Sequence, residues 1–140
     1  MAETESTYVV RPIGVVRSPL RDLDQAPRQP DEDAPTAQIV LDDRVAPALE
    51  GIGAGAVIEL LTWLHQADRD TLQTRPRDDA TRPMTGVFAT RSPHRPNPIG
   101  LHTVTVVDVG RSSLRVAGLE AIDGTPVLDI KVALRAPDQR

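Results

Sequence analysis

Short β-prone segments, separated by glycine, proline and charged residues, constrain the fold of this chain more than any other feature. Apolar residues alternate with Asp129 and Lys131 near the C-terminus, which is typical of a strand with one buried face. Gly110 and the pair Asp123-Gly124 stand where turns are expected. The pattern predicts about seven strands, at residues 8–17, 37–41, 56–65, 84–90, 101–109, 114–122 and 127–134. With helical turns only at 42–50, the fold class is all-β, and such strands form a barrel or a sandwich.

The composition limits the kind of core and the kind of site. The 140 residues fit one domain, and 39% are hydrophobic but only 2% aromatic, so the core must be aliphatic. The chain has no cysteine, which excludes disulfides, thiolate metal sites and a cysteine nucleophile. The sequence shows neither an apolar secretory leader nor an apolar run long enough to span a bilayer, so we expect a cytoplasmic protein.

The charge distribution points in two directions. A net charge of −4 argues against a nucleic-acid partner, but residues 69–95 carry six arginines and three acidic residues. A local basic patch attracts phosphate even on an acidic protein. The alternative interpretation is a solvated, arginine-rich loop, and charge alone does not separate the two.

The segment at residues 86–101, GVFATRSPHRPNPIGL, is the best candidate for a binding site. Three X-Pro pairs restrict its backbone far more than a simple chain reversal requires. Such a loop holds polar side chains in set directions at low entropic cost; these are Arg91, Ser92, His94, Arg95 and Asn97. The alternative is a rigid crossing at one end of a barrel with its arginines in solvent.

This segment resembles the signature of the TsaA-like (TrmO) family of tRNA methyltransferases. Other motifs of the chain are similar to that family in the same order: PIGVVRSP at 12–19, PRQ at 27–29, WLH at 63–65 and DGTPVLDIK at 123–131. Residues 1–7, much of 66–83 and the C-terminal tail fall outside the resemblance. The sequence departs from the family pattern at His94, where Phe is common, and at His102, where Ser is common.

The resemblance implies a single β-barrel domain over residues 1–140, and we expect its ends at 1–7 and 137–140 to be flexible. A further departure from the family pattern is that the sequence shows no counterpart of the C-terminal domain of longer bacterial members. The resemblance also implies a homodimer and S-adenosylmethionine as methyl donor, with no metal. The implied acceptor is the exocyclic amine of threonylcarbamoyl-adenosine beside the tRNA anticodon. By match to the family motifs, the cofactor would be held by Pro27, Arg28, Gln29, His65, Gln66, Arg91, Leu101, Asp123, Gly124, Thr125 and Pro126. In this family the cofactor site lies close to the partner subunit.

The residues are chemically compatible with these roles, and each also has a simpler explanation. An Asp123 carboxylate suits a cationic donor or its ribose hydroxyls, and Arg28 or Arg91 suits a carboxylate. Asp123-Gly124 is equally typical of a hairpin turn, and His65 of a core histidine. The expected RNA contacts are Arg69, Arg75, Arg77, Arg95 and Asn97.

The sequence identifies no catalytic base, and Ser92, His94 and Asp129 lack the nucleophile elbow of a hydrolase triad. Two alternative functions therefore stay open. One is a methyltransferase of a small molecule on the same fold, and the other is a non-catalytic S-adenosylmethionine-binding module.

Overall fold

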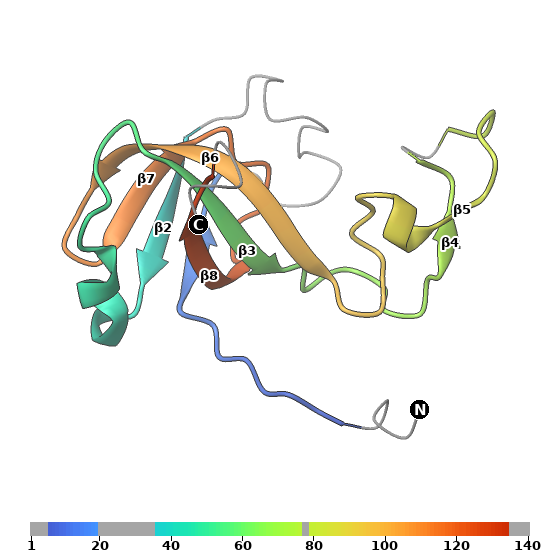
Figure 1. The fold of residues 1–140 in the computed structure, drawn as a ribbon, viewed down its shortest axis with the longest axis horizontal. Helices are drawn as coiled ribbons and strands as arrows, with labels where there is room; N and C mark the ends of the chain where they lie inside the picture. The colour runs from blue at the N-terminus through green and yellow to red at the C-terminus, as the bar shows by residue number, and fades with distance from the viewer. Residues whose placement is uncertain (1–5, 20–35, 77–78, 135–140) are drawn as a thin grey trace.

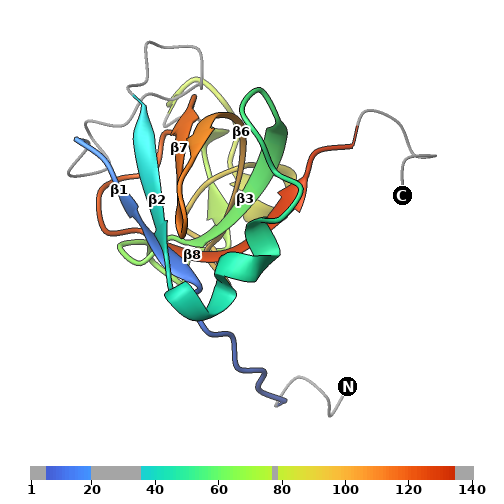
Figure 2. The same ribbon diagram turned by 90° about the vertical axis from the view of Figure 1, so that its left-hand side faces the viewer.

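The protein is built around a closed six-stranded barrel, seen in a computed structural model that describes residues 6–19, 36–76 and 79–134. Neighbouring strands follow the order β1-β2-β7-β6-β3-β8 and pair antiparallel, and β8 returns to β1. Figure 2 shows this ring of strands. The strands are β1 (Gly14–Arg17), β2 (Ala37–Leu41), β3 (Val57–Trp63), β6 (Ile99–Val109), β7 (Ser113–Ala117) and β8 (Pro126–Val132). The all-β prediction is confirmed, and closure leaves the barrel without an exposed sheet edge.

Alternation of side chains builds an aliphatic core, as the low aromatic content predicts. Along β3, Ile58, Leu60 and Thr62 are buried while the residues between them face outward. The core cluster joins residues from all six barrel strands, among them Val16, Ile39, Val104, Leu114 and Val127. Among the described residues, no helix is long and apolar enough to cross a membrane.

An arm, residues 64–98, leaves the barrel after β3 and returns at β6. It carries the two-stranded sheet of β4 (Gln73–Thr74) and β5 (Thr85–Gly86) and the 3-10 helix η4 (Val87–Ala89). Figure 1 shows the arm extending away from the barrel beyond the end of β3. The arm contains all of the basic window and most of the proline-rich segment, whose last residues belong to β6, so the fold separates an aliphatic barrel from a polar extension.

The strand predicted at residues 84–90 is wrong for most of its length. Only Thr85–Gly86 pairs with β4, and the chain then turns into η4. The change occurs because the carbonyl oxygens of Val87 and Thr90 accept hydrogen bonds from Arg95, at 2.8 and 3.3 Å, instead of from a neighbouring strand. A contact 5 to 8 residues further along the chain thus overrides a local β preference.

Three other predicted elements differ at their ends. The strand predicted at 8–17 begins only at Gly14, because residues 6–12 are exposed outside the barrel, where Tyr8 is 87% exposed. The strand predicted at 114–122 ends at Ala117, before the left-handed Gly118 (φ +88°). The predicted helical turns form the 3-10 helix η2 (Asp43–Leu49), which Gly51 follows.

The two predicted hairpin turns have different outcomes. Gly110 joins β6 to β7, which are sheet neighbours, and its N–H bonds the carbonyl of Ser113 at 2.8 Å. Asp123-Gly124 leads into β8, but β8 pairs with β1 and β3 rather than with β7. The second turn is therefore a crossing at the barrel end and not a hairpin between neighbours.

Candidate functional site

The two segments singled out in the sequence meet at one end of the barrel, which we call the site end. Thr62 of β3 pairs with Gly100 of β6 on one side and with Val127 of β8 on the other. Because adjacent strands lie about 4.8 Å apart, the start of β6 and the start of β8 are separated by roughly 10 Å. The proline-rich segment and the Asp-Gly-Thr-Pro turn are thus brought together across a single strand.

The turn at residues 122–125 is closed by its own backbone and fastened to β1. Thr125 donates to the carbonyl of Ile122 through its hydroxyl (2.8 Å) and through its N–H (3.2 Å). Gly124 adopts φ +86°, and its N–H bonds Val16 O at 2.8 Å. The Asp123 carboxylate accepts the Ser18 N–H at 3.0 Å. Thr125 is buried, so its contribution is to hold the shape of the turn, while Asp123 and Gly124 lie half-buried at the surface.

The proline-rich segment is tied to the end of β3. The N–H of Leu64 bonds Pro98 O at 2.8 Å, and that of Arg95 bonds Asp68 O at 3.0 Å. His94 Nδ1 in turn accepts the Asp68 N–H at 2.9 Å. His65 and Gln66 are exposed in the turn between these anchors.

Arg91 reaches back to the start of β6. Its Nη2 donates to the carbonyl oxygen of Leu101 at 2.9 Å. The predicted cofactor residues His65, Gln66, Arg91 and Leu101 therefore belong to the same barrel end as the turn at 123–126. Pro27, Arg28 and Gln29, predicted as further cofactor residues, lie outside the described residues.

A polar pair that was not predicted from the sequence, buried Thr62 and half-buried His102, lies inside the site end. His102 Nε2 is 2.8 Å from the hydroxyl oxygen of Thr62, and Thr62 is fully buried. Burial, reinforced by the nearby Arg91 charge, lowers the pKa of His102 to about 4, so the ring is neutral at physiological pH. Its Nδ1 is buried and has no hydrogen-bond partner within the described part of the chain. The sequence signal for this pair was Thr62, a polar residue that follows Ile58 and Leu60 on the inward face of β3.

Arg69 and Arg95, predicted as RNA contacts, are held by contacts within the arm. Arg69 lies over the Trp63 ring, 5.1 Å from its centroid, and donates to Pro96 O (2.8 Å) and to Asn97 Oδ1 (3.0 Å). Asn97, also predicted as an RNA contact, is thereby tied to the arm as well. Arg95 donates to three carbonyl oxygens around η4.

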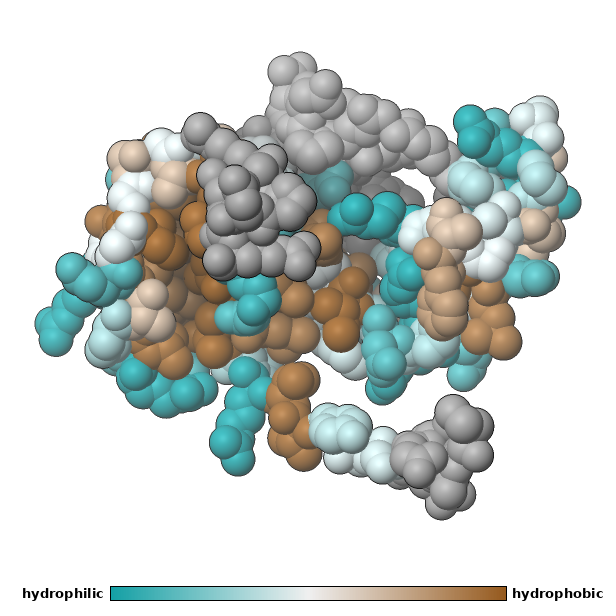
Figure 3. All heavy atoms as spheres, in the orientation of Figure 1, coloured by the Kyte–Doolittle hydropathy of each residue, from teal (hydrophilic) through white to brown (hydrophobic). Residues whose placement is uncertain are grey.

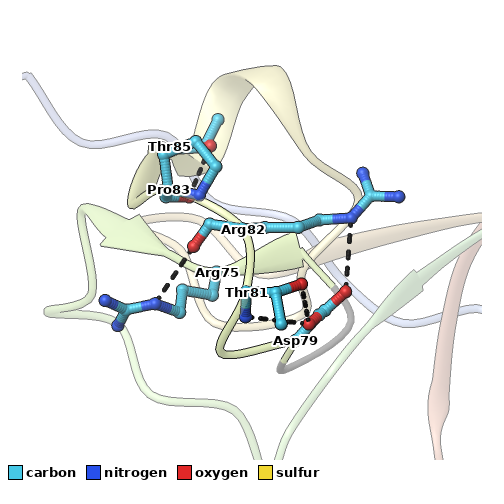
Figure 4. Close-up of polar contacts among 6 residues, drawn as sticks. All are labelled: Arg75, Asp79, Thr81, Arg82, Pro83 and Thr85. Carbon is cyan, nitrogen blue, oxygen red and sulfur yellow. Dashed lines mark hydrogen bonds and ion pairs between the residues drawn. The ribbon is translucent and has the colours of Figure 1, made fainter.

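Arg75 and Arg82, two further basic residues of the arm, lie at the turn drawn in Figure 4. Arg75 donates from Nε to the carbonyl oxygen of Arg82 at 3.1 Å, and Arg82 Nε lies 3.6 Å from Asp79 Oδ2. The other carboxylate oxygen of Asp79 accepts the hydroxyl and the N–H of Thr81, and the hydroxyl bond above all lowers the pKa of Asp79. Arg77 lies outside the described residues.

Two further observations limit the kind of site. No group of three or more metal-ligating side chains exists within residues 6–19, 36–76 and 79–134. A concavity lined by Leu49, Gly53 and Arg111 lies at the opposite end of the barrel. The site end therefore contains no metal-ligating group among the described residues, and the concavity is separate from it.

Comparison with known protein families identifies the family to which the chain belongs. The family described as tRNA-methyltransferase O N-terminal domain matches residues 15–139. The chain belongs to this family. The resemblance found from the proline-rich segment and the DGTP turn is thereby confirmed, and the TrmO-family barrel is a methyltransferase fold.

Curated TrmO-family relatives match most of the chain. It is 42% identical over 123 residues to a protein of Archaeoglobus fulgidus named S-adenosyl-L-methionine-binding protein, covering 88% of this chain and 87% of the relative. It is 41% identical to a putative S-adenosylmethionine-dependent methyltransferase, RcsF, of Pseudomonas aeruginosa, covering 89% of this chain and 56% of that protein.

Solved structures of TrmO share the fold. The crystal structure of TrmO from Pseudomonas aeruginosa superposes with a TM-score of 0.75 at 34% identity, covering 96% of this chain and 61% of that one. Another TrmO crystal structure gives the same TM-score at 36% identity and is covered over 63% of its length. The chain thus spans about three fifths of the length of these solved TrmO chains.

Proposed function

We propose that this protein binds S-adenosylmethionine at the site end and methylates the exocyclic amine of adenosine, or threonylcarbamoyl-adenosine, next to the anticodon of tRNA. The observation that carries the proposal is the approach of the Arg91–Leu101 contact and the Asp123–Gly124 turn across one strand. Methyl transfer needs alignment more than it needs acid–base groups, so two preorganised loops at a fixed separation suit it.

The groups at the site end fit this cofactor. Arg91 offers a guanidinium for the methionine carboxylate, and Asp123 offers a carboxylate for the sulfonium charge or the ribose hydroxyls. A Cβ built at Gly124 meets no atom of the described residues within 4 Å, so none of these residues fills the space beside the turn. When bound, S-adenosylmethionine supplies an activated methyl group for transfer from sulfur to the acceptor nitrogen. The names of the relatives, as S-adenosylmethionine-binding proteins and a putative methyltransferase, support the same cofactor.

The charges of the arm favour RNA over a small molecule as acceptor. Pairing of the arginines with acidic residues would favour a small substrate, but only Arg82 pairs with a carboxylate among the described arginines of the arm. Arg69, Arg75, Arg91 and Arg95 donate to neutral carbonyl oxygens and keep their charge. Phosphates of an anticodon stem-loop are the matching ligand, and action in the cytoplasm follows from this substrate.

A homodimer is part of the proposal. The outward residues Ile99 and Leu101 of β6 are 45% and 43% exposed and lie at the site end. Val57, which is 40% exposed, lies on the paired strand β3 toward the opposite end of the barrel. Apolar residues gathered on one face of a barrel are typical of a contact between subunits. Figure 3 shows apolar surface on the barrel side of the molecule. Sedimentation of the purified chain over a concentration series tests the assembly.

Product analysis tests the activity. The protein is incubated with isotope-labelled S-adenosylmethionine and total tRNA from a strain lacking the gene, and digested nucleosides are identified by mass spectrometry. We expect a labelled methyl group on the base of an anticodon-adjacent adenosine. Formation of S-adenosylhomocysteine with small molecules but not with RNA would instead support a small-molecule methyltransferase. Binding of the cofactor without turnover in the presence of tRNA would support a binding module.

A further inference from the structure

Phe88 is an aromatic side chain presented to solvent on the arm. It is 83% exposed, although the chain has only one Phe, one Trp and one Tyr. The residue before it, Val87, is 2% exposed, so the chain buries the smaller apolar side chain and turns the larger one outward. Leaving a phenyl ring in water is unfavourable, and an exposed large aromatic therefore calls for a function.

Hydrogen bonds from Arg95 and to Leu72 hold the backbone around Phe88 in place. Arg95 Nη2 donates to Val87 O at 2.8 Å, and its Nη1 donates to Thr90 O at 3.3 Å and to Ser92 O at 3.0 Å. The Val87 N–H bonds Leu72 O at 3.0 Å, which fastens η4 to the segment that precedes β4. The ring thus stands on a preorganised support, which reduces the entropic cost of binding a ligand.

Phe88 lies on an arm that is rich in arginine. Arg95 bonds the carbonyl oxygens on either side of Phe88, and Arg75 and Arg91 of the same arm also donate to neutral carbonyl oxygens, so no carboxylate compensates these three charges among the described residues. The described part of the arm carries five arginines against the three aspartates Asp68, Asp70 and Asp79, and its net charge is therefore positive. The arm therefore combines fixed positive charge with one exposed aromatic ring.

We propose that Phe88 is a platform on which an unpaired base of an RNA loop stacks, while Arg75 and its neighbours contact adjacent phosphates. This inference rests on the proposed tRNA substrate and adds a base-binding residue to it. Stacking on an aromatic ring beside basic side chains is how proteins hold single-stranded nucleic acid without reading its sequence. A second copy of the chain is the competing occupant, because Phe, Met and Arg are enriched at protein interfaces and Leu72 and Met84 of the arm are also exposed. The excess of arginine on the arm favours RNA, because its phosphates attract cationic side chains.

Binding of RNA, measured without methyl transfer, tests the proposal. The probes are a fluorescently labelled anticodon stem-loop and a blunt duplex of equal length, followed by anisotropy at constant salt. We expect Phe88→Ala to weaken stem-loop binding by roughly 5- to 100-fold, the range for loss of one base–aromatic stack. Phe88→Trp should retain stem-loop affinity, duplex binding should not change, and Tyr8→Ala serves as the matched exposed aromatic outside the arm.

Two parallel measurements on Phe88→Ala separate other ligands of the ring. Loss of S-adenosylmethionine affinity in calorimetry with unchanged stem-loop affinity would assign the ring to the adenine of the cofactor and overturn the proposal. A shift toward monomer in sedimentation with unchanged stem-loop affinity would assign it to a second copy of the chain and overturn it equally. Wild-type protein that fails to bind the stem-loop contradicts the proposed tRNA substrate. Wild-type binding that Phe88→Ala leaves intact contradicts only the platform.

Discussion

The Nε2 of His102 and the hydroxyl oxygen of Thr62 lie 2.8 Å apart inside the barrel, joined by a bond that runs diagonally from β6 to β3. In the ladder His102 faces Leu60, and Thr62 faces Gly100. The bond therefore passes beside Gly100, where the missing side chain makes room for it. Thr62, Gly100 and His102 thus pack together at the site end, close to the contact between Arg91 and Leu101.

Stability should depend on pH through His102. Its pKa is about 4 in the folded protein and about 6.5 in the unfolded chain, so between these values only the unfolded state binds the proton. The free energy of unfolding should fall as pH decreases from about 6.5 to about 4, by on the order of 3 kcal/mol, and His102 should contribute no further change below about pH 4.

Urea denaturation of the wild type and of His102→Ser across this range measures the effect. The variant should lose the slope between pH 6.5 and 4. It should keep the acid loss expected from Asp68 and Asp79, whose pKa values are lowered by hydrogen bonds from Thr71 and Thr81. Parallel pH profiles for the two proteins would mean that folding does not lower the pKa of His102.

Gly100→Ala should destabilise the barrel. A Cβ at this position would overlap the Thr62 hydroxyl and lie 2.7 Å from His102 Nε2 and 3.0 Å from a methyl group of Leu64. We expect a loss of about 1–3 kcal/mol in the free energy of unfolding. Gly53→Ala is the matched control, because a Cβ there meets nothing within 4 Å. Equal stability of the two variants would show that the polar pair can shift without cost.

Arg69→Ala should change the fluorescence of the single tryptophan and weaken cofactor binding. The guanidinium lies over Trp63 and bonds Pro96 and Asn97, so it joins the end of β3 to the proline-rich segment. We expect a shifted emission maximum and a several-fold higher dissociation constant for S-adenosylmethionine, consistent with loss of about 1 kcal/mol. Arg82→Ala, which removes an exposed ion pair on the same arm, should alter neither. An unchanged emission spectrum in Arg69→Ala would contradict the contact.

Asp123→Asn should discriminate between the cofactor and its product. The amide oxygen can still accept the Ser18 N–H, so the turn should persist while the negative charge is lost. If the carboxylate faces the sulfonium, affinity for S-adenosylmethionine should fall about tenfold, and that for S-adenosylhomocysteine, which has a neutral sulfur, much less. Calorimetry with both ligands measures the ratio, with Asp108→Asn as control. Equal losses would place the carboxylate on the ribose instead.

Arg75→Glu should raise the Michaelis constant for tRNA and reduce its salt dependence. Removing one phosphate contact lowers the slope of log affinity against log salt by roughly 0.7 to 0.9, and the reversed charge adds repulsion. The Michaelis constant for S-adenosylmethionine should not change. Arg111→Glu, at the opposite end of the barrel, is the control. A selective effect on the cofactor would mean that Arg75 belongs to the site end.

Local patterns in the sequence determined the elements of the barrel. Short β-prone segments located β2 and β3, alternation of apolar residues located β8, and Gly110 marked the turn between β6 and β7. These features depend on neighbours in the chain, so they can be read directly from it. The motif order at residues 86–101 and 123–131 likewise identified the family and the two segments that form the site end.

Only the tertiary structure decided which side chains far apart in the sequence contact each other. Thr62 and His102 are 40 positions apart, Arg69 and Asn97 are 28 apart, and their pairing depends on strand register and on the path of the arm. The same is true of η4, where Arg95 captures carbonyl oxygens that a strand would have used, and of Phe88, which this turn directs into solvent. Periodicity reports which face of a strand is buried, whereas a contact between distant residues exists only once the barrel has closed.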